Sequence, residues 1–232
     1  MTPASPRWSD EPADPAAWTA AHDRLYTRYA GLYDVAVRVV PVWRRWLRQA
    51  LPEIRGPRVL EVSFGTGWLL TQYADRHRTD GVDLNAALVE VARRTLARAG
   101  VHADLRQGSV EALPYPDDTF DTVVSTMAFT GYPDAAAAAA ELARVTKPGG
   151  RLVLVDIAYP HDGNRWGTLL VDRVWRPLGD LVRDLPAVLT DAGFEVRDDE
   201  VGGWGSVHRY VATRPATSGP GPVSPPSPGP SQ

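Results

Sequence analysis

The chain has 232 residues, 44% of them hydrophobic and 23% charged, which is typical of one soluble globular domain. The formal net charge is −3, and no segment concentrates Lys and Arg, so nucleic acid is not an expected partner. Cysteine is absent, which excludes disulfides, cysteine nucleophiles and thiolate metal sites and favours the reducing cytoplasm.

The two ends of the chain differ in composition from its middle. Residues 1–17 are rich in Pro, Ala and acidic residues without periodicity, and they predict a disordered N-terminal tail rather than a signal peptide. Residues 215–232 contain seven prolines, three glycines and four serines, and predict a second disordered tail. A single folded domain is therefore expected over residues 18–214, without a membrane-spanning helix.

Strand and helix patterns alternate along the first half of this domain. A helix is expected over residues 35–51, with a kink at Pro41. The elements expected next are a strand at 58–62, a helix at 68–74, a strand at 79–83, a helix at 86–99 and a strand at 103–107.

The second half continues the alternation and ends in a hairpin. Strands are expected at 121–125 and 151–156, separated by a helix at 134–145 that the 147–150 Lys-Pro-Gly-Gly turn ends. A helix at 180–192 and strands at 194–201 and 207–213 follow. This pattern predicts an α/β fold with a Rossmann-like, doubly wound, seven-stranded sheet. The sheet is mostly parallel, has an antiparallel C-terminal hairpin strand and carries helices on both faces.

In such a sheet, ligands bind beyond the carboxyl ends of the central strands. The first strand leads into Glu61-Val62-Ser63-Phe64-Gly65-Thr66-Gly67. Gly65 and Gly67 allow the backbone to approach a ligand closely, so this turn is the predicted cofactor site. A dinucleotide fingerprint is disfavoured because Trp68 or Leu70 stands where its small third residue is needed.

Asp83 closes the second predicted strand, 16 residues after Gly67. A carboxylate there can accept hydrogen bonds from both hydroxyls of a ribose. The alternative is an Asp that caps the following helix. The glycine turn upstream favours the ribose role.

Four ordered segments, VLEVSFGTG, GVDLN, QGSVEALPYPDDTFDTVVS and ELARVTKPGGRLVLVD, resemble the signature blocks of class I S-adenosylmethionine (SAM) dependent methyltransferases. The resemblance is strongest to the group of quinone and phospholipid methylating enzymes and covers residues 26–156. It implies SAM as cofactor and S-adenosylhomocysteine as product. The positions it assigns to cofactor binding are Tyr26, Tyr33, Glu61, Ser63, Phe64, Gly65, Thr66, Gly67, Asp83, Leu84, Gly108, Ser109, Val110, Ser125 and Met127.

By the resemblance, Glu61 and the turn face the methionine part of SAM, and Leu84 and Ser109 face the adenine. Two residues depart from the family pattern. Ser63 replaces the first glycine of the turn, and Ser109 replaces an acidic residue. A neutral hydroxyl is a weaker acceptor than a carboxylate, so less tight cofactor binding is expected.

Methyl transfer from a sulfonium mainly requires alignment of the acceptor and exclusion of water. The segment after the fifth strand contains the candidate catalytic residues Asp156, Tyr159 and His161. A solvated turn is the competing interpretation for His161. His208 is expected to be structural, and no metal site is predicted because no His/Asp/Glu pair shows ligand spacing with a matching second half.

Residues 160–183 form a connection longer than the fold requires, and they predict a cap over the acceptor pocket. Aromatic residues there and near Trp43 suggest an apolar, ring-bearing acceptor. The leading hypothesis is SAM-dependent methylation of a small molecule in secondary metabolism or in quinone or lipid modification. The alternatives are a SAM-binding enzyme that catalyses a cyclisation or rearrangement, and a peripheral membrane or regulatory module that uses residues 42–48. The sequence does not predict the oligomeric state.

Overall fold

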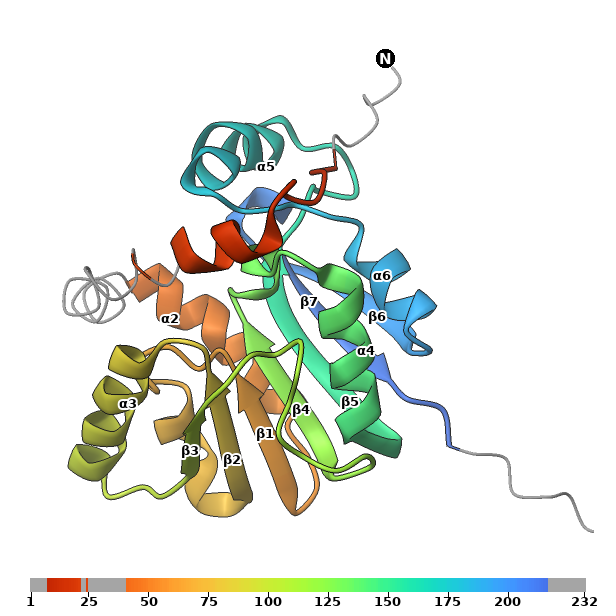
Figure 1. Cartoon of the computed structure of the whole chain (residues 1–232). Helices are drawn as coiled ribbons and strands as arrows, with labels where there is room; N and C mark the ends of the chain where they lie inside the picture. The colour runs from red at the N-terminus through yellow and green to blue at the C-terminus, as the bar shows by residue number, and fades with distance from the viewer. Residues whose placement is uncertain (1–7, 22–23, 25–40, 217–232) are drawn as a thin grey trace, which may run out of the picture.

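A computed structural model describes residues 8–21, 24 and 41–216, and its core is a seven-stranded sheet (Figure 1). The strands are β1 (Arg58–Val62), β2 (Arg78–Asp83), β3 (Asp104–Gln107), β4 (Phe120–Thr126), β5 (Thr146–Ile157), β6 (Glu195–Gly202) and β7 (Val207–Thr213). Their order across the sheet is β3-β2-β1-β4-β5-β7-β6. From β1 the chain adds β2 and β3 on one side. It then adds β4 on the other side of β1, and β5, β7 and β6 extend the sheet to the opposite edge.

The strand directions confirm the predicted mixed sheet. β1 pairs in parallel with β2 and β4, while β2 pairs in parallel with β3 and β4 with β5. β7 inserts antiparallel between β5 and β6. The carboxyl ends of β1, β2, β4 and β5 consequently lie along one edge of the sheet, which is where ligands bind in this architecture.

Helices cover both faces of the sheet (Figure 1). They are α2 (Pro41–Leu47), α3 (Ala86–Ala99), α4 (Ala135–Val145), α5 (Arg165–Leu170) and α6 (Leu185–Asp191). Buried residues of α4 and α6 pack with Leu60, Phe120 and Leu154 in one core. Buried residues of α2 and α3 pack with Val59 and Val153 in a second core on the opposite face. The alternating side chains of each strand therefore supply both cores.

The two longest helices have the expected end signals. The side chain of Asn85 accepts a hydrogen bond from Leu88 N–H at the start of α3, and Gly100 ends that helix with φ +68°. At the start of α4 the Asp134 carboxylate accepts from Ala137 N–H at 2.8 Å. These caps satisfy backbone groups that a helix end leaves without partners.

Three predicted helices differ from the structure. Of the helix expected over 35–51, residues 35–40 lie outside the described residues, and α2 is followed by a 3₁₀ segment, Arg48–Glu53. The expected helix at 68–74 is instead two 3₁₀ turns, Leu70–Gln72 and Ala74–Arg76, because Tyr73 between them has φ −145°. The expected helix at 180–192 starts only at Leu185, with Asp184 as its cap.

The fifth strand begins earlier than predicted. The 147–150 turn does not separate helix from strand, because β5 already starts at Thr146, opposite Phe120 of β4. Gly149 takes φ +76°, and its N–H donates to Arg214 O at 2.8 Å. The irregular register between Phe120 and Thr122 accommodates this segment as a bulge.

The N-terminal segment is in contact with the domain before the predicted boundary at residue 18. Ser9 N–H donates to Val182 O at 2.7 Å, and Trp18 Nε1 donates to Gly131 O at 3.2 Å. Residues 15–21 are helical and lie below α5, at the edge where the parallel strands end (Figure 1). The tail predicted for 1–17 is therefore bound to the domain from residue 8 in the structure.

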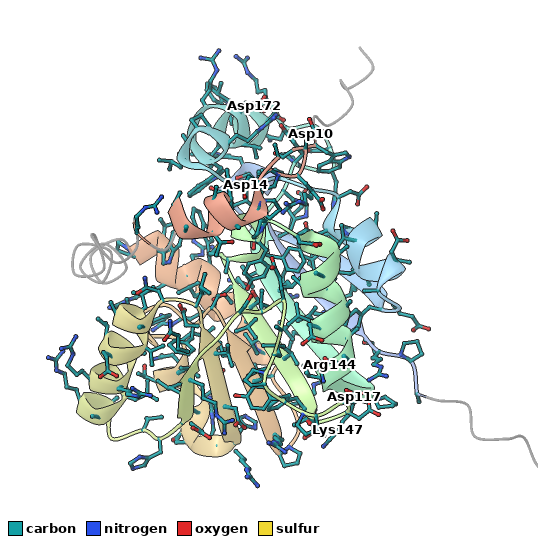
Figure 2. The ribbon with its side chains drawn as sticks, viewed as in Figure 1. Asp10, Asp14, Asp117, Arg144, Lys147 and Asp172 are labelled. Carbon is teal, nitrogen blue, oxygen red and sulfur yellow. The ribbon has the colours of Figure 1, made fainter. Side chains whose placement is uncertain are left out.

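Several charged side chains lie at the edge of the sheet opposite the carboxyl ends of the parallel strands. Arg144, Asp117 and Lys147 lie far from Asp10, Asp14 and Asp172 (Figure 2). Arg144 forms ion pairs with Asp117 at 2.8 Å and with Glu141 at 2.6 Å.

Across residues 8–21, 24 and 41–216, no helix has the length and apolar character needed to cross a bilayer.

Candidate active site

The turn after β1 is held against the end of β2. Ser63 N–H donates to Val82 O at 2.7 Å, and Gly65 N–H donates to the Asp83 carboxylate at 2.8 Å. Gly67 has φ +73°, and a Cβ added there would lie 2.8 Å from the Cβ of Ala92 in α3. Gly67 is therefore needed both for its backbone angle and for the close packing of α3.

Ser63 occupies a left-handed backbone conformation with φ +52°, which explains why glycine is usual at this position in the family pattern. Its hydroxyl lies 2.8 Å from the hydroxyl of Tyr132, which in turn lies 3.3 Å from Ser125 Oγ. This chain of hydroxyls connects the turn after β1 to β4. The unfavourable backbone angle of Ser63 is thus accompanied by side-chain hydrogen bonds that glycine cannot make.

Glu61 is a buried carboxyl group at the start of the site. Its side chain is 1% exposed and accepts a hydrogen bond from Tyr73 Oη at 2.7 Å. The pKa of Glu61 is raised to about 8, mainly because the group is buried; the Tyr73 hydrogen bond lowers the pKa and the nearby Asp83 charge raises it. The carboxyl group is therefore poised to ionise when a cationic group binds beside it.

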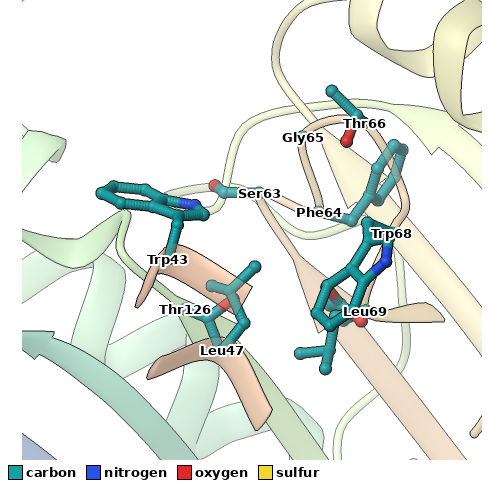
Figure 3. A pocket seen from close by; sticks show the side chains of 10 residues that line it. Trp43, Leu47, Ser63, Phe64, Gly65, Thr66, Trp68, Leu69 and Thr126 are labelled. Atoms are coloured by element: carbon teal, nitrogen blue, oxygen red, sulfur yellow. The ribbon is translucent and has the colours of Figure 1, made fainter. Parts of the chain in front are cut away.

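A small hollow with about 30 Å³ of enclosed space, open to solvent on one side, is lined in part by Glu61 and the turn (Figure 3). Its lining consists of Trp43, Leu47, Glu61, Ser63, Phe64, Gly65, Thr66, Trp68, Leu69 and Thr126. Trp43 and Trp68 lie on opposite sides, with Ser63 between them. Apart from Glu61, none of the described lining residues carries an ionisable group. The rest of the lining consists of apolar side chains, hydroxyl groups and backbone groups.

The end of β2 provides the second part of the site. Asp83 is 6% exposed, and its carboxylate accepts from Gly65 N–H and Asn85 N–H, the latter at 2.9 Å. Leu84 beside it is 38% exposed. Gly108 N–H donates to Asp83 O at 2.9 Å, which brings the Gly108–Val110 segment alongside, and Ser109 Oγ accepts from Glu111 N–H at 3.2 Å.

Comparison with known proteins gives consistent matches. Residues 59–150 match the family model described as a methyltransferase domain. A phosphatidylethanolamine N-methyltransferase of Cereibacter sphaeroides is 36% identical over 138 residues, which cover 59% of this chain and 68% of that protein. The chain belongs to the class I SAM-dependent methyltransferases.

Two further matches show how much of the chain shares this similarity. A ubiquinone/menaquinone biosynthesis C-methyltransferase of Marinomonas sp. strain MWYL1 is 30% identical over 148 residues, and the alignment spans 59% of each chain. A SAM-dependent methyltransferase structure from Thermotoga maritima, titled a possible histamine N-methyltransferase, has a TM-score of 0.64 at 20% identity. It covers 82% of this chain and 99% of the Thermotoga chain, and shows the same fold.

The residues of this methyltransferase fit SAM, the cofactor of its family. SAM carries a cationic amino group, and the buried Glu61 carboxyl supplies the negative charge that would stabilise it. The glycine turn leaves the space next to its backbone clear of side chains. The predicted binding residues Tyr26 and Tyr33 lie outside the described residues.

Asp156, predicted to be catalytic, organises the loop after β4. Its carboxylate accepts from the N–H groups of Ala128, Phe129, Thr130 and Ile157 and from the hydroxyl of Thr130, at 2.6–3.3 Å. It is fully buried, and burial raises its pKa to about 6. Since these donors surround it, Asp156 holds the loop after β4 in place, and the catalytic role expected for it stays a prediction.

Tyr159 and His161, the other predicted catalytic residues, also interact away from the hollow. Tyr159 Oη donates to Asp172 at 2.7 Å, which connects the end of β5 to the predicted cap. His161 Nε2 lies 2.9 Å from Asp198 of β6. Neither residue lines the hollow. The structure therefore separates all three predicted catalytic side chains from the candidate acceptor space.

The predicted cap over 160–183 consists of α5, a π-helical turn (Val171–Trp175) and a 3₁₀ turn (Arg176–Leu178). Val171 is buried, whereas Trp166 is 54% exposed and Leu178 is 68% exposed. Trp175 reaches towards α2, with ring centroids 6.3 Å from Trp43 and 6.2 Å from Trp46. The segment thus packs one side on the domain and presents apolar side chains on the other.

Sequence reasoning missed several residues of the site. They are Tyr73, which bonds Glu61, Tyr132, which bonds Ser63, and the wall residues Leu47, Trp68 and Leu69. Trp68 was used only to exclude a dinucleotide site, and Trp43 was noted only for its aromatic character. Tyr73 had no signal, because its contact depends on the break between two 3₁₀ turns rather than on a helical spacing.

Proposed function

We propose that this protein transfers the methyl group of SAM to a small, apolar acceptor of the quinone, lipid or aromatic natural-product type. The observation that carries the proposal is the hollow between Trp43 and Trp68, which adjoins Glu61 and the glycine turn. An apolar wall next to a cofactor site favours an acceptor with hydrophobic or ring surface. The phospholipid and quinone methyltransferases among the relatives support the same acceptor class.

In this proposal the residues of the turn bind and orient the cofactor. Glu61 holds the cationic amino group, Asp83 holds the ribose hydroxyls, and the Gly108–Val110 segment with Leu84 lies at the adenine. The bound cofactor supplies an electrophilic methyl group on a sulfonium. Trp43, Trp68 and Thr126 align the acceptor and exclude water, which are the main requirements of an in-line displacement.

The lining of the hollow also indicates which kind of acceptor atom receives the methyl group. Glu61 is its one ionisable side chain among the described residues, and it is already hydrogen-bonded to Tyr73. A hydroxyl acceptor benefits from a general base in reach, whereas an amine or an activated carbon needs less help. We therefore favour an amine or a carbon activated by a neighbouring oxygen as the methylated atom.

The test is incubation of the protein with methyl-labelled SAM and three acceptor classes: quinone precursors, phosphatidylethanolamine vesicles and free aromatic amines. Formation of S-adenosylhomocysteine together with a labelled product supports the proposal. A Trp43→Ala variant is expected to raise the KM for the acceptor about 10-fold, because it removes an aromatic wall. The 66% exposed Trp204 provides a matched control variant, Trp204→Ala, with unchanged KM.

Two results would contradict the proposal. An acceptor converted to a cyclised or rearranged product without S-adenosylhomocysteine would show that the fold serves another reaction. Equal KM values for the Trp43→Ala variant and the wild type, with every acceptor that is methylated, would remove the hollow as the acceptor site.

A further inference from the structure

A cluster of His161, Asp198 and His208 lies outside the methyltransferase site. His161 follows β5, Asp198 lies in β6 and His208 lies in β7. Asp198 Oδ2 is 2.9 Å from His161 Nε2, and Asp198 Oδ1 is 2.7 Å from His208 Nδ1. One ligand atom of each residue lies within 4.8 Å of the others, so the topology converges two imidazoles and a carboxylate on one point.

The hydrogen bonds of His208 indicate what must lie between its Nδ1 atom and the Asp198 carboxylate. His208 is 1% exposed, and its Nε2 lies 2.8 Å from Gly205 O. A carbonyl oxygen only accepts, so Nε2 carries the hydrogen. In neutral His208 the lone pair of Nδ1 is therefore directed at the Asp198 carboxylate, which is also an acceptor. Two acceptors at 2.7 Å repel each other unless a proton or a metal ion lies between them.

This arrangement also matches the environment of a metal-ligating histidine. Such a histidine usually donates its second ring N–H to a backbone carbonyl or a carboxylate, which fixes the tautomer and the ring orientation. The carbonyl of Gly205 fills that role for His208. The His208 ring also stacks on Tyr210, with centroids 5.8 Å apart, which restricts its rotation.

We propose that His161, Asp198 and His208 bind one divalent transition-metal ion of the zinc type. Imidazole and carboxylate ligands suit Zn²⁺ and its neighbours, and no cysteine is present to compete. Bonds of about 2.0–2.1 Å to Zn²⁺ place neighbouring ligand atoms about 3.3 Å apart, so small side-chain shifts complete the site. The Glu200 carboxylate, 3.5 Å from His161 Nδ1, lies next to this ligand set.

The site also has an entry path. The side chain of His161 is 55% exposed and that of Asp198 is 16% exposed, whereas His208 forms the buried floor. A metal ion can therefore arrive from solvent, and His161 can adjust to it because it is the least constrained ligand.

The position of the cluster indicates what the ion does for the protein. His161 precedes α5, and Gly205 belongs to the turn between β6 and β7. These two segments touch tightly, since a Cβ added to Gly167 of α5 would lie 2.2 Å from Trp204 O. A metal ion here fastens the base of the cap to the last two strands. This role is independent of the proposed acceptor.

The test uses the full chain without a polyhistidine tag, treated with EDTA and dialysed. Titration calorimetry with ZnCl₂ alone, and separately with CoCl₂ followed by visible absorption, measures stoichiometry and ligand field. We expect one ion per chain and a metal-dependent rise in Tm. His161→Ala and Asp198→Asn are each expected to weaken binding at least about 10-fold. The His102→Ala variant, which changes an exposed histidine outside the cluster, is the matched control and should bind as wild type.

Because His161 is largely exposed, the His161→Ala variant is expected to fold, and circular dichroism checks this. Absence of saturable Zn²⁺ and Co²⁺ binding to the wild type overturns the proposal. Binding that both cluster variants leave unchanged also overturns it, because the ion then lies elsewhere.

Discussion

The two edges of the parallel sheet hold their carboxylates in opposite ways. At the amino edge, Asp117 and Asp121 pair with Arg144 and Lys147, and the side chains remain partly exposed. At the carboxyl edge, Glu61 and Asp156 are buried, and the hydrogen bonds they accept come from a tyrosine hydroxyl, a threonine hydroxyl and backbone N–H groups.

The electrostatic consequences differ accordingly. Paired, solvated carboxylates stabilise the fold only slightly. Buried carboxyl groups that accept hydrogen bonds from uncharged donors have a raised pKa, about 8 for Glu61 and about 6 for Asp156. A buried acid of this kind is costly in the empty protein and becomes favourable when a cation binds to it. Cofactor chemistry is therefore expected at the carboxyl edge and structural support at the amino edge.

The largest expected effect is at Asp156. The Asp156→Ala substitution leaves several buried donors without an acceptor and should lower the free energy of unfolding by about 4 kcal/mol. Urea denaturation measures this change. A variant with wild-type stability and a large loss of kcat would contradict the positioning role and support the catalytic one.

Glu61 is expected to show its effect in cofactor binding. The Glu61→Gln substitution keeps an acceptor for Tyr73 but removes the charge, so the affinity for SAM should fall about 100-fold, or roughly 2.7 kcal/mol. Calorimetric titration with S-adenosylhomocysteine measures the loss. Asp121→Asn at the amino edge is the control, and an equal loss there would show that the two edges are not functionally distinct.

The raised pKa of Glu61 also predicts a pH dependence of stability. The folded-state pKa of about 8 lies above the ordinary pKa of 4.5 for a glutamate side chain, so the folded protein holds an extra proton between these pH values. The Glu61 contribution to stability is therefore full below pH 4.5 and is lost as the pH rises through 8. Urea denaturation from pH 5 to 9 should show this decline in the wild type and a weaker one in Glu61→Gln. Parallel curves would contradict the assigned pKa.

An effect similar in size to that of Glu61→Gln is expected at Gly67, one of two glycines with positive φ that can be compared. Gly67→Ala combines a strained φ of +73° with a 2.8 Å contact to Ala92, and should cost about 3 kcal/mol. Gly100→Ala has a similar φ of +68° but no atom within 4 Å, and should cost about 1 kcal/mol. Thermal unfolding compares the two. Equal costs would mean that close packing of α3 on the turn contributes nothing.

The smallest effect is expected at the amino edge. Arg144→Ala removes partly exposed ion pairs and hydrogen bonds to two carbonyls, and should lower stability by about 1 kcal/mol. Its affinity for S-adenosylhomocysteine should stay at the wild-type value. The exposed Arg94→Ala in α3 serves as the surface control. Weakened cofactor binding in Arg144→Ala alone would link the two edges.

The order of strands and helices could be predicted from the sequence, because each hydrophobic period and each Gly or Asp at an element end acts locally. It also placed Glu61, Asp83 and the glycine turn at strand ends, and the topology of a parallel sheet brings such ends together. The helix at 68–74 failed as a prediction because the backbone of Tyr73 leaves the helical region there.

The contacts of the remaining polar residues depend on tertiary packing and could not be predicted from the sequence. Asp156 was expected to be catalytic from its position alone, yet the loop after β4 wraps around it and supplies its donors. Asp198 in β6 and His208 in β7 lie 37 and 47 residues after His161, and only the β5-β7-β6 order brings the three within 4.8 Å. Spacing along the chain carries no signal for such contacts, because strand pairing, not local geometry, creates them.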